Sequence, residues 1–216
     1  MNSPRQHPAV KVSGLYAVTP DEAATEALLE KVRRAIAGGA GIIQYRGKNV
    51  DPVTRLSQAE ALASLTRAQQ TLFIVNDCAE LAGRVGAGGV HLGRDDGDVA
   101  VARAVLPGKI IGVSCYADLA RAIEAEKAGA DYVAFGAAFA SATKPGAAPA
   151  PLSLYREAKR RLRIPVVAIG GIDLKNAEQL IAAGVDAVAV ISALFNANDI
   201  TAAAKGFSDL FKKARQ

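Results

Sequence analysis

Thr71–Asp96 reads TLFIVNDCAELAGRVGAGGVHLGRDD, and this stretch decides the fold. Its two short apolar runs, Leu72–Val75 and Val90–Leu92, are separated by a segment with a helical pattern. Apolar runs of this length, connected in this way, predict neighbouring parallel strands that are buried on both faces. Each run breaks off into polar residues, Asn76-Asp77 after the first and Asp95-Asp96 after the second. We therefore expect carboxylates on adjacent strand ends, at the edge of the sheet where such folds bind ligands.

Carboxylates on neighbouring strand ends are unfavourable unless a cation lies between them. A few carboxylates together with phosphate oxygens are the ligands that Mg²⁺ prefers. The sequence therefore predicts that Asp77 and Asp96 hold one Mg²⁺ ion in an enzyme that handles phosphate or pyrophosphate. The alternative is that both are helix N-caps, because Asp77 precedes Cys78–Arg84 and Asp96 precedes Val99–Val105.

The alternation of apolar run and amphipathic segment continues in both directions from this stretch. Glycines precede every second predicted strand, at Gly39, Gly88, Gly129 and Gly184, and a left-handed glycine at a helix end is the usual helix-to-strand turn. The predicted strands are 14–19, 41–45, 72–75, 90–92, 110–113, 132–135, 165–169 and 187–190. The predicted helices are 22–37, 53–69, 78–84, 99–105, 118–127, 152–162, 175–183, 192–195 and 202–213. Eight strand–helix units predict an α/β fold, a single-domain (β/α)8 TIM barrel over residues 13–216, preceded by a disordered extension over 1–12.

The composition excludes several classes of function. Of 216 residues half are hydrophobic, yet no stretch is long enough to span a membrane, and the first residues lack the apolar core of a secretory signal. We expect a cytoplasmic protein whose two cysteines, Cys78 and Cys115, are reduced. The net charge is 26 − 21 = +5, but its basic clusters fall on predicted helices and aromatics make up only 5%, which argues against a nucleic-acid surface. Small molecules are the expected partners, and the sequence leaves the oligomeric state open.

In the second predicted strand and the residues after it, polar side chains occupy alternate positions. Because side chains alternate across a strand, Ile42, Gln44, Arg46 and Lys48 should face the barrel axis, while Ile43 and Tyr45 face the helices. Two cations aimed into a barrel mouth need a neutralising anion. That anion is a bound diphosphate or, alternatively, the carboxylate of Asp77 or Asp96.

A second anion site is predicted after the last two strands, where this fold commonly binds phosphate. Gly170-Gly171 follows the seventh strand and Ile191-Ser192 follows the eighth. The longest connection, residues 136–151, carries Ser141, Thr143 and Lys144 and is expected to act as a lid.

Two further polar residues have open roles. Ser114, at the end of the fifth strand, either bonds a ligand heterocycle or caps the next helix. His91 is expected to be a packed, hydrogen-bonded histidine, and the sequence suggests no Ser–His or Cys–His nucleophile pair. Two anion sites predict an enzyme that joins two phosphorylated fragments, or that transfers a group from a pyrophosphate donor.

Seven motifs, taken in order, resemble those of the thiamine phosphate synthase family over nearly the whole chain, from Leu15 to about Phe211. They are QYRGK at 44–48, IVND at 74–77, HLGRDD at 91–96, GVS at 112–114, SATK at 141–144, AIGGI at 168–172 and VISAL at 190–194. Two positions depart from the family pattern, with Ala137 in place of Pro and Ser141 in place of Thr.

The resemblance implies a role for each candidate residue. Asp77 and Asp96 match the family's Mg²⁺ ligands. The residues that match pyrophosphate contacts are Arg46, Lys48, Asn76 and Lys144, and those that match pyrimidine contacts are Gln44 and Ser114. The residues that match thiazole phosphate contacts are Ser141, Thr143, Gly171, Ile191 and Ser192. Of these, we expect Arg46, Lys48, Lys144 and Ser114 to act in catalysis.

The resemblance also implies a reaction. The family couples 4-amino-5-hydroxymethyl-2-methylpyrimidine diphosphate with 4-methyl-5-(2-phosphooxyethyl)thiazole by a dissociative substitution. One alternative is the thiazole tautomerase paralogue, which has a histidine where this chain has Tyr116 and lacks the Asn-Asp pair. Another is a non-catalytic protein that binds thiazole phosphate or thiamine phosphate.

Overall fold

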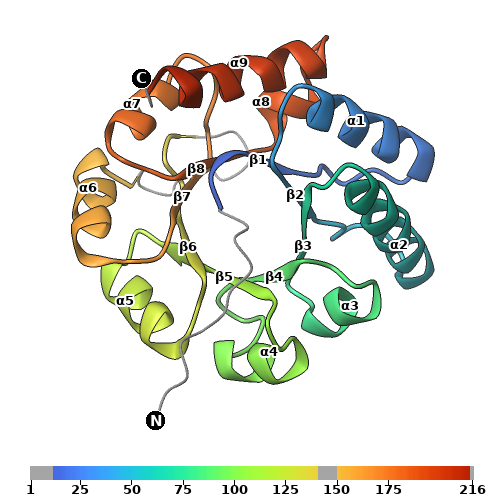
Figure 1. Cartoon of the computed structure of the whole chain (residues 1–216), viewed down its shortest axis with the longest axis horizontal. Helices are drawn as coiled ribbons and strands as arrows, with labels where there is room; N and C mark the ends of the chain where they lie inside the picture. The colour runs from blue at the N-terminus through green and yellow to red at the C-terminus, as the bar shows by residue number, and fades with distance from the viewer. Residues whose placement is uncertain (1–11, 141–149, 215–216) are drawn as a thin grey trace.

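The structure is a computed structural model that describes residues 12–140 and 150–214. Eight parallel strands form a closed barrel in the order β1 to β8, and helices surround it (Figure 1). The strands are β1 (Gly14–Val18), β2 (Ile42–Tyr45), β3 (Leu72–Asn76), β4 (Gly89–Leu92), β5 (Ile110–Tyr116), β6 (Tyr132–Phe135), β7 (Val166–Ile169) and β8 (Ala187–Val190). The predicted (β/α)8 barrel is confirmed.

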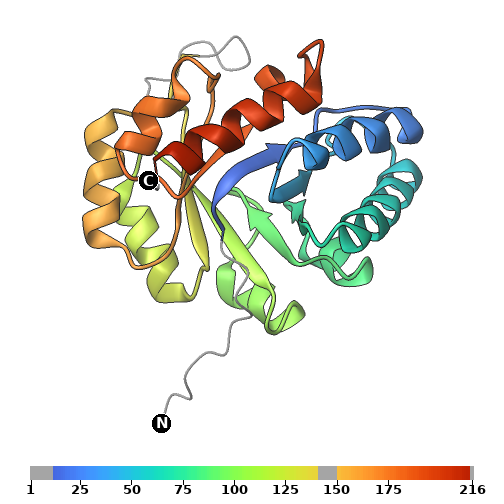
Figure 2. The ribbon, with the colours of Figure 1, turned by 45° about the horizontal axis from the view of Figure 1, so that its top comes forward.

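The helices follow the strands in sequence and cover the outside of the barrel. They are α1 (Thr25–Ala37), α2 (Pro52–Ala68), α3 (Ala79–Arg84), α4 (Val99–Val105), α5 (Leu119–Ala128), α6 (Leu152–Arg161), α7 (Ala177–Ala182), α8 (Ser192–Phe195) and α9 (Ile200–Lys213). The last helix, α9, lies beside α1 (Figure 2), and Thr201 and Ser208 donate hydrogen bonds to the backbone oxygens of Arg34 and Gly39 (3.2 and 3.1 Å). These contacts join the two ends of the chain around the barrel.

Alternation of side chains along the strands produces two apolar clusters. Inside the barrel lie Tyr16, Ile42 and Ile74, with others from alternate positions. Between strands and helices lies a larger cluster that contains Ile43 and Tyr45. The predicted facing of these β2 residues is therefore confirmed. Val12 is buried in the interior cluster, one residue before the predicted start of the barrel, whereas residues 1–11 of the predicted extension lie outside the described part of the chain.

The predicted glycine turns are present in three of four units. Gly39, Gly129 and Gly184 have φ of 101°, 99° and 93°, in the left-handed region that glycine adopts without strain. In the fourth unit the left-handed glycine is Gly86, with φ of 67°, and not Gly88. Here the left-handed glycine directly follows Val85, the C-cap of α3, and Ala87-Gly88 lead from this turn into β4.

Strand β5 extends to Tyr116, three residues beyond its predicted end at Val113. The pairing register with β6 shifts between Ser114 and Tyr116, and such an irregularity re-aims side chains at the rim of a barrel. The apolar pattern stopped at Val113 because Ser114 and Tyr116 are polar, although Cys115 between them is buried. The pattern therefore did not reveal the extra length of the strand.

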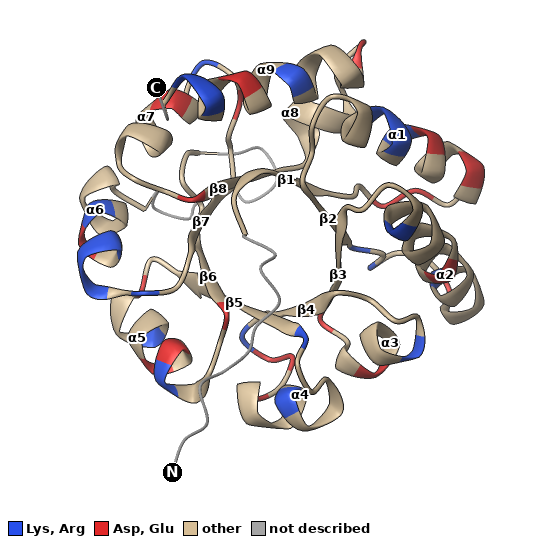
Figure 3. Cartoon of the chain, viewed as in Figure 1, with Lys and Arg blue, Asp and Glu red and all other residues tan. Residues whose placement is uncertain are grey.

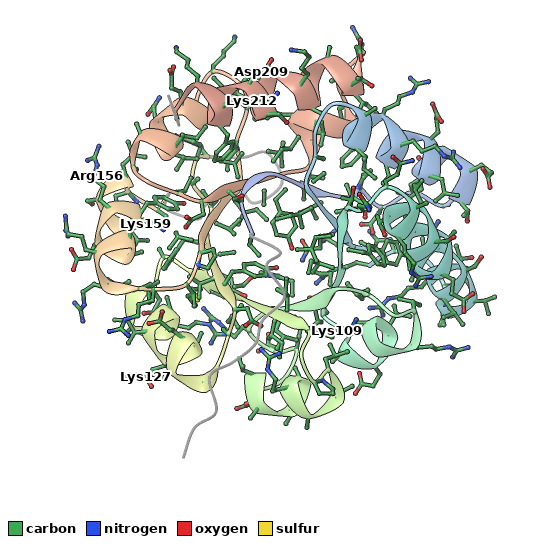
Figure 4. The ribbon with its side chains drawn as sticks, in the orientation of Figure 1. Lys109, Lys127, Arg156, Lys159, Asp209 and Lys212 are labelled. Atoms are coloured by element: carbon green, nitrogen blue, oxygen red, sulfur yellow. The ribbon has the colours of Figure 1, made fainter. Side chains whose placement is uncertain are left out.

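Charged residues lie on the helices and loops, and the strands contain no Lys, Arg, Asp or Glu (Figure 3). The basic clusters on helices are solvent-facing, as predicted: Lys31 pairs with Glu22 at 2.7 Å, and Lys212 of α9 pairs with Asp209 at 3.0 Å (Figure 4). No helix in the described ranges is long and apolar enough to cross a membrane.

Candidate active site

Two carboxylates converge at the ends of β3 and β4. Asp77 follows β3 with φ of 67°, and its N–H donates to the backbone oxygen of His91 on β4 at 2.8 Å. Asp96, in the β4–α4 loop, accepts a hydrogen bond from the Gly93 N–H at 2.8 Å. Burial raises the pKa of Asp96, and the Asp77 carboxyl, a hydrogen-bonding neighbour, raises it further. The structure thus brings together the two predicted metal ligands.

Neither carboxylate caps a helix. The N-cap of α3 is Cys78, whose Sγ accepts from the Leu81 N–H at 3.4 Å. The N-cap of α4 is Asp98, whose Oδ1 accepts from the Ala100 N–H at 2.6 Å. The capping alternative is therefore wrong, and Asp77 and Asp96 need another explanation.

The chemistry of this pair suits Mg²⁺. Among the described residues there is no group of three or more His, Cys, Asp or Glu placed to hold a metal ion. Mg²⁺ is commonly bound through one or two carboxylates, with substrate phosphates and water completing its shell. Asp77 and Asp96 fit that donor set.

Cations from the β2–α2 loop lie beside the carboxylates. The Lys48 ammonium is 3.0 Å from Asp77 Oδ2, so the predicted alternative of a salt bridge to Asp77 holds for Lys48. Arg46 instead pairs with Asp21 at 3.2 Å. Both side chains stay partly exposed, with 51% of the Lys48 side chain and 35% of the Arg46 side chain accessible. Both cations remain accessible to an incoming anion.

Asp21 is a site residue that sequence reasoning missed. Its carboxylate accepts hydrogen bonds from the backbone N–H of Lys48 at 2.7 Å and from the Asn49 side chain at 2.8 Å, besides its pair with Arg46. It therefore fixes the loop that carries both cations. The sequence did contain one signal for Asp21, because this residue lies two positions after Thr19, where the first predicted strand ends.

The amide pair Gln44 and Asn76 joins the ends of β2 and β3. Gln44 Nε2 donates to Asn76 Oδ1 at 3.2 Å, and Gln44 is buried. Both amides are thus held next to Asp77, with Asn76 partly exposed.

Ser114 belongs to a hydrogen-bonded chain that enters the barrel. Its Oγ lies 2.8 Å from His91 Nε2, while His91 Nδ1 lies 2.9 Å from the Tyr132 hydroxyl. The Tyr132 hydroxyl in turn lies 2.8 Å from that of Tyr16. Asp118 caps α5 by accepting from the Arg121 N–H at 3.0 Å, so Ser114 is not the cap.

The Ser114–His91 contact was not predicted from the sequence, whereas the expectation of a packed, hydrogen-bonded His91 is confirmed. Burial lowers the pKa of His91 to about 4, against a smaller opposing effect of Asp96. A ring with this pKa is a poor base near neutral pH, and its second nitrogen contacts a phenol rather than a carboxylate. The contact is therefore suited to orienting Ser114 and not to activating it as a nucleophile.

Arg121 links the end of β5 to the residue that follows β4. Its Nε donates to the Ser114 carbonyl at 2.9 Å and its Nη2 to the Gly93 carbonyl at 3.4 Å. Nothing in the sequence indicated these contacts.

The depressed pKa of His91 predicts a pH-dependent stability. Below pH 6.5, the ordinary pKa, the His91 ring is protonated in the unfolded chain, whereas in the folded protein it stays neutral down to about pH 4. The free energy of unfolding should therefore fall as pH drops from 6.5 toward 4, with His91 contributing about 2 kcal/mol between pH 7.5 and 5. Urea unfolding at both pH values, for the wild type and His91→Gln, isolates this contribution. Equal pH dependence in the two proteins would contradict it.

The predicted phosphate cradle lies at the ends of the adjacent strands β7 and β8. Gly171 has φ of 65°, and a Cβ there would lie 2.6 Å from the Phe139 carbonyl oxygen, so only glycine fits. Ser192 is the exposed first residue of α8 and Ile191 is its N-cap. Gly171, Ile191 and Ser192 thus occupy neighbouring strand ends.

Ser141, Thr143 and Lys144 lie outside the described residues, as does most of the predicted lid. The described residues at the two ends of this connection are anchored to β7 and to each other: the Ala138 N–H donates to the Ile169 carbonyl and the Ala150 N–H to the Ala137 carbonyl, both at 2.8 Å.

Comparisons with known proteins show the family of the chain. Residues 15–194 match the family described as thiamine monophosphate synthase. A thiamine-phosphate synthase of Methylobacillus flagellatus is 53% identical over 95% of this chain and 99% of its own length. One from Aromatoleum aromaticum is 50% identical over 94% and 99%. The solved structure of a thiamine phosphate pyrophosphorylase from Pyrococcus furiosus has a TM-score of 0.87 and 37% identity, covering 97% of this chain and 100% of that one.

Structures with lower identity, such as a 3-hexulose-6-phosphate synthase at 22% and a TM-score of 0.71, share the barrel alone. The family match covers most of the chain, and about half of the residues are identical in the named relatives. These two findings establish the family of the chain. The chain belongs to the thiamine monophosphate synthase family and is a transferase of thiamine biosynthesis.

Proposed function

We propose that the enzyme couples 4-amino-5-hydroxymethyl-2-methylpyrimidine diphosphate with 4-methyl-5-(2-phosphooxyethyl)thiazole in a Mg²⁺-dependent reaction, and that it releases pyrophosphate and thiamine phosphate. The supporting observation is the convergence of Asp77, Asp96 and the Lys48 ammonium at one rim of the barrel. Two neighbouring carboxylates with a cation beside them form an arrangement suited to a metal-bound diphosphate.

The diphosphate would be held from several sides. Mg²⁺ bound by Asp77 and Asp96 would neutralise charge on the leaving group. Lys48, Arg46 and Lys144 would donate charge-assisted hydrogen bonds to the phosphate oxygens, and Asn76 would donate from its amide. Asp21 keeps the backbone of Lys48 and the guanidinium of Arg46 in place before the substrate arrives. Stabilisation of departing negative charge is therefore the main contribution of the protein.

The pyrimidine would lie between Gln44 and Ser114, whose polar groups are oriented by Asn76 and His91. In the dissociative path, the bond between carbon and diphosphate breaks first, and the electron-rich aminopyrimidine supports the positive charge left on its exocyclic carbon. The thiazole nitrogen then forms the new bond with its lone pair. No general base is needed, which is consistent with a neutral, weakly basic His91.

The thiazole phosphate would be held at the ends of β7 and β8. Backbone N–H groups at Gly171, Ile191 and Ser192 can approach a phosphate closely, and we propose that Ser141 and Thr143 add hydroxyl contacts. Positioning of the two fragments is the second contribution of the protein.

The decisive experiment incubates the pure enzyme with both fragments and measures pyrophosphate release. We expect release only when both fragments and Mg²⁺ are present, because leaving-group stabilisation and positioning are both required. Chelation by EDTA should stop the reaction, and added Mg²⁺ should restore it. Binding of the fragments without turnover would support the non-catalytic alternative, and interconversion of thiazole tautomers without the pyrimidine would support the tautomerase. A cytoplasmic location stays a prediction.

A further inference from the structure

A cavity of about 560 Å³ opens between α2 and α3, beside the proposed diphosphate site. Its lining includes Lys48, Asn76 and Asp77, together with Arg55 of α2 and Arg84 of α3. The two helices are neighbours outside the ring of strands (Figure 1). A cavity of this size is within the range that binds small molecules. We call it the side pocket.

Arg55 lacks a partner for its charge. Its Nε is buried and has no hydrogen-bond partner, and the guanidinium forms no ion pair with the carboxylates of the described residues. Arg55 is only partly buried, but a buried guanidinium nitrogen without a hydrogen-bond partner is unfavourable, and an anion that accepted from it would remove this cost. The guanidinium also lies close enough to the buried Tyr45 phenol to oppose the rise in its pKa that burial causes.

The remaining polar groups of the side pocket do not neutralise Arg55. Asp77 is paired with Lys48 at 3.0 Å, and the Glu80 carboxylate accepts a weak hydrogen bond from the Cys78 thiol at 3.6 Å. Arg84 is exposed at the end of α3 and, like Arg55, forms no ion pair within the described ranges. The lining therefore carries two guanidinium groups without an ion pair, a Lys48–Asp77 pair and the Glu80 carboxylate, and its net charge is positive.

The chemistry of these walls selects a phosphate-type anion. Guanidinium groups bind phosphate oxygens through paired N–H donors, and two of them match the two phosphoryl groups of a diphosphate. The side pocket is continuous with the proposed catalytic site through Lys48 and Asp77, which line both. A diphosphate leaving the carboxylate pair would therefore meet Arg55 and Arg84 next.

We propose that the side pocket is a second anion site, in which Arg55 and Arg84 hold inorganic pyrophosphate after it leaves Asp77 and Asp96 and before it reaches solvent. The proposal rests on the proposed function, because that reaction supplies the pyrophosphate.

The first test measures binding of inorganic pyrophosphate by calorimetry in buffer with EDTA, so that no metal contributes. The variants are Arg55→Met, Arg84→Met and the double variant, because Met is a good helix former of similar length. Arg156→Met is the matched control, since Arg156 is an exposed arginine that points outward from α6 (Figure 4). We expect the affinity for pyrophosphate to fall at least about tenfold in the double variant, because charge-assisted hydrogen bonds are lost. In the control the affinity should stay unchanged.

The second test uses the synthase assay. Inhibition by added pyrophosphate should weaken about tenfold in the double variant, while KM for the pyrimidine diphosphate changes little. An equal change in the inhibition constant for pyrophosphate and in KM for the pyrimidine diphosphate would show that the arginines bind the substrate. That result would overturn the proposal. Unchanged pyrophosphate affinity in an active double variant would overturn it too, and would leave the proposed function standing.

Thermal unfolding separates binding from a structural role. Removing the unpartnered Nε should leave the melting temperature of Arg55→Met equal to or above that of the wild type. In buffer with EDTA, pyrophosphate should raise the melting temperature less in Arg55→Met, and least in the double variant, than in the wild type and the control. A lower melting temperature in Arg55→Met, with the same rise on adding pyrophosphate, would show that Arg55 is structural.

Discussion

Asp77→Asn should lower kcat by a factor on the order of 10² to 10³, as expected for the loss of a major charge-stabilising group, while the fold stays intact. The substitution removes the negative charge and keeps the shape of the side chain. Asparagine is the substitution of choice because Asp77 has φ of 67°, and asparagine tolerates this region better than alanine. An effect of Asp77→Asn is therefore attributable to the carboxylate. The measurements are kcat at saturating substrates over a Mg²⁺ titration, with thermal unfolding as the check on folding.

Asp95→Asn is the matched control. Asp95 is exposed in the β4–α4 loop, next to Asp96, so the control removes the same charge a short distance from the site. We expect near wild-type kcat from Asp95→Asn. If Asp77→Asn also kept wild-type kcat, Asp77 would have no place in the mechanism.

The barrel was predictable because its signals are local. Apolar runs of four or five residues, amphipathic segments and left-handed glycines each reflect a requirement of one strand, one helix or one turn. The same locality explains the carboxylate pair: Asp77 and Asp96 follow consecutive strands, and consecutive parallel strands in this fold lie side by side.

Other parts of the site depend on contacts between distant segments, and a single sequence does not reveal them. Asp21 organises the loop of Arg46 and Lys48 from another strand end. His91 reaches Ser114 because β4 and β5 are neighbours and because the β5 irregularity re-aims the strand end. Periodicity predicts on which face a residue lies, but not which polar partner it meets there.

The interior network depends on one glycine in the centre of β5. Gly112 pairs in register with His91 on one side and with Tyr132 on the other. A Cβ on Gly112 would overlap the Tyr132 ring at Cζ and the hydroxyl. The absence of a side chain at this position therefore makes room for the phenol that contacts His91.

Gly112→Ala should lower the free energy of unfolding by about 3 kcal/mol, because an extra methyl group in a packed interior costs about 1–3 kcal/mol and displaced hydrogen bonds add to that. Tyr132 is fully buried, and its hydroxyl contacts both His91 and Tyr16, so the ring cannot move without weakening both contacts. Urea unfolding measures the loss. Since His91 also orients Ser114, we expect KM for the pyrimidine diphosphate to rise.

Gly41→Ala provides the comparison for Gly112→Ala. A Cβ on Gly41, just before β2, would have its nearest neighbour, the Ser13 carbonyl oxygen, at 3.8 Å, an ordinary contact. It should therefore change the free energy of unfolding far less than Gly112→Ala does. If the two variants were equally stable, the Tyr132 ring would have room to shift, and the rigid link from the barrel interior to Ser114 would not exist. A large loss in Gly112→Ala alone, with raised KM, would show that packing inside the barrel sets the position of a polar group at its rim.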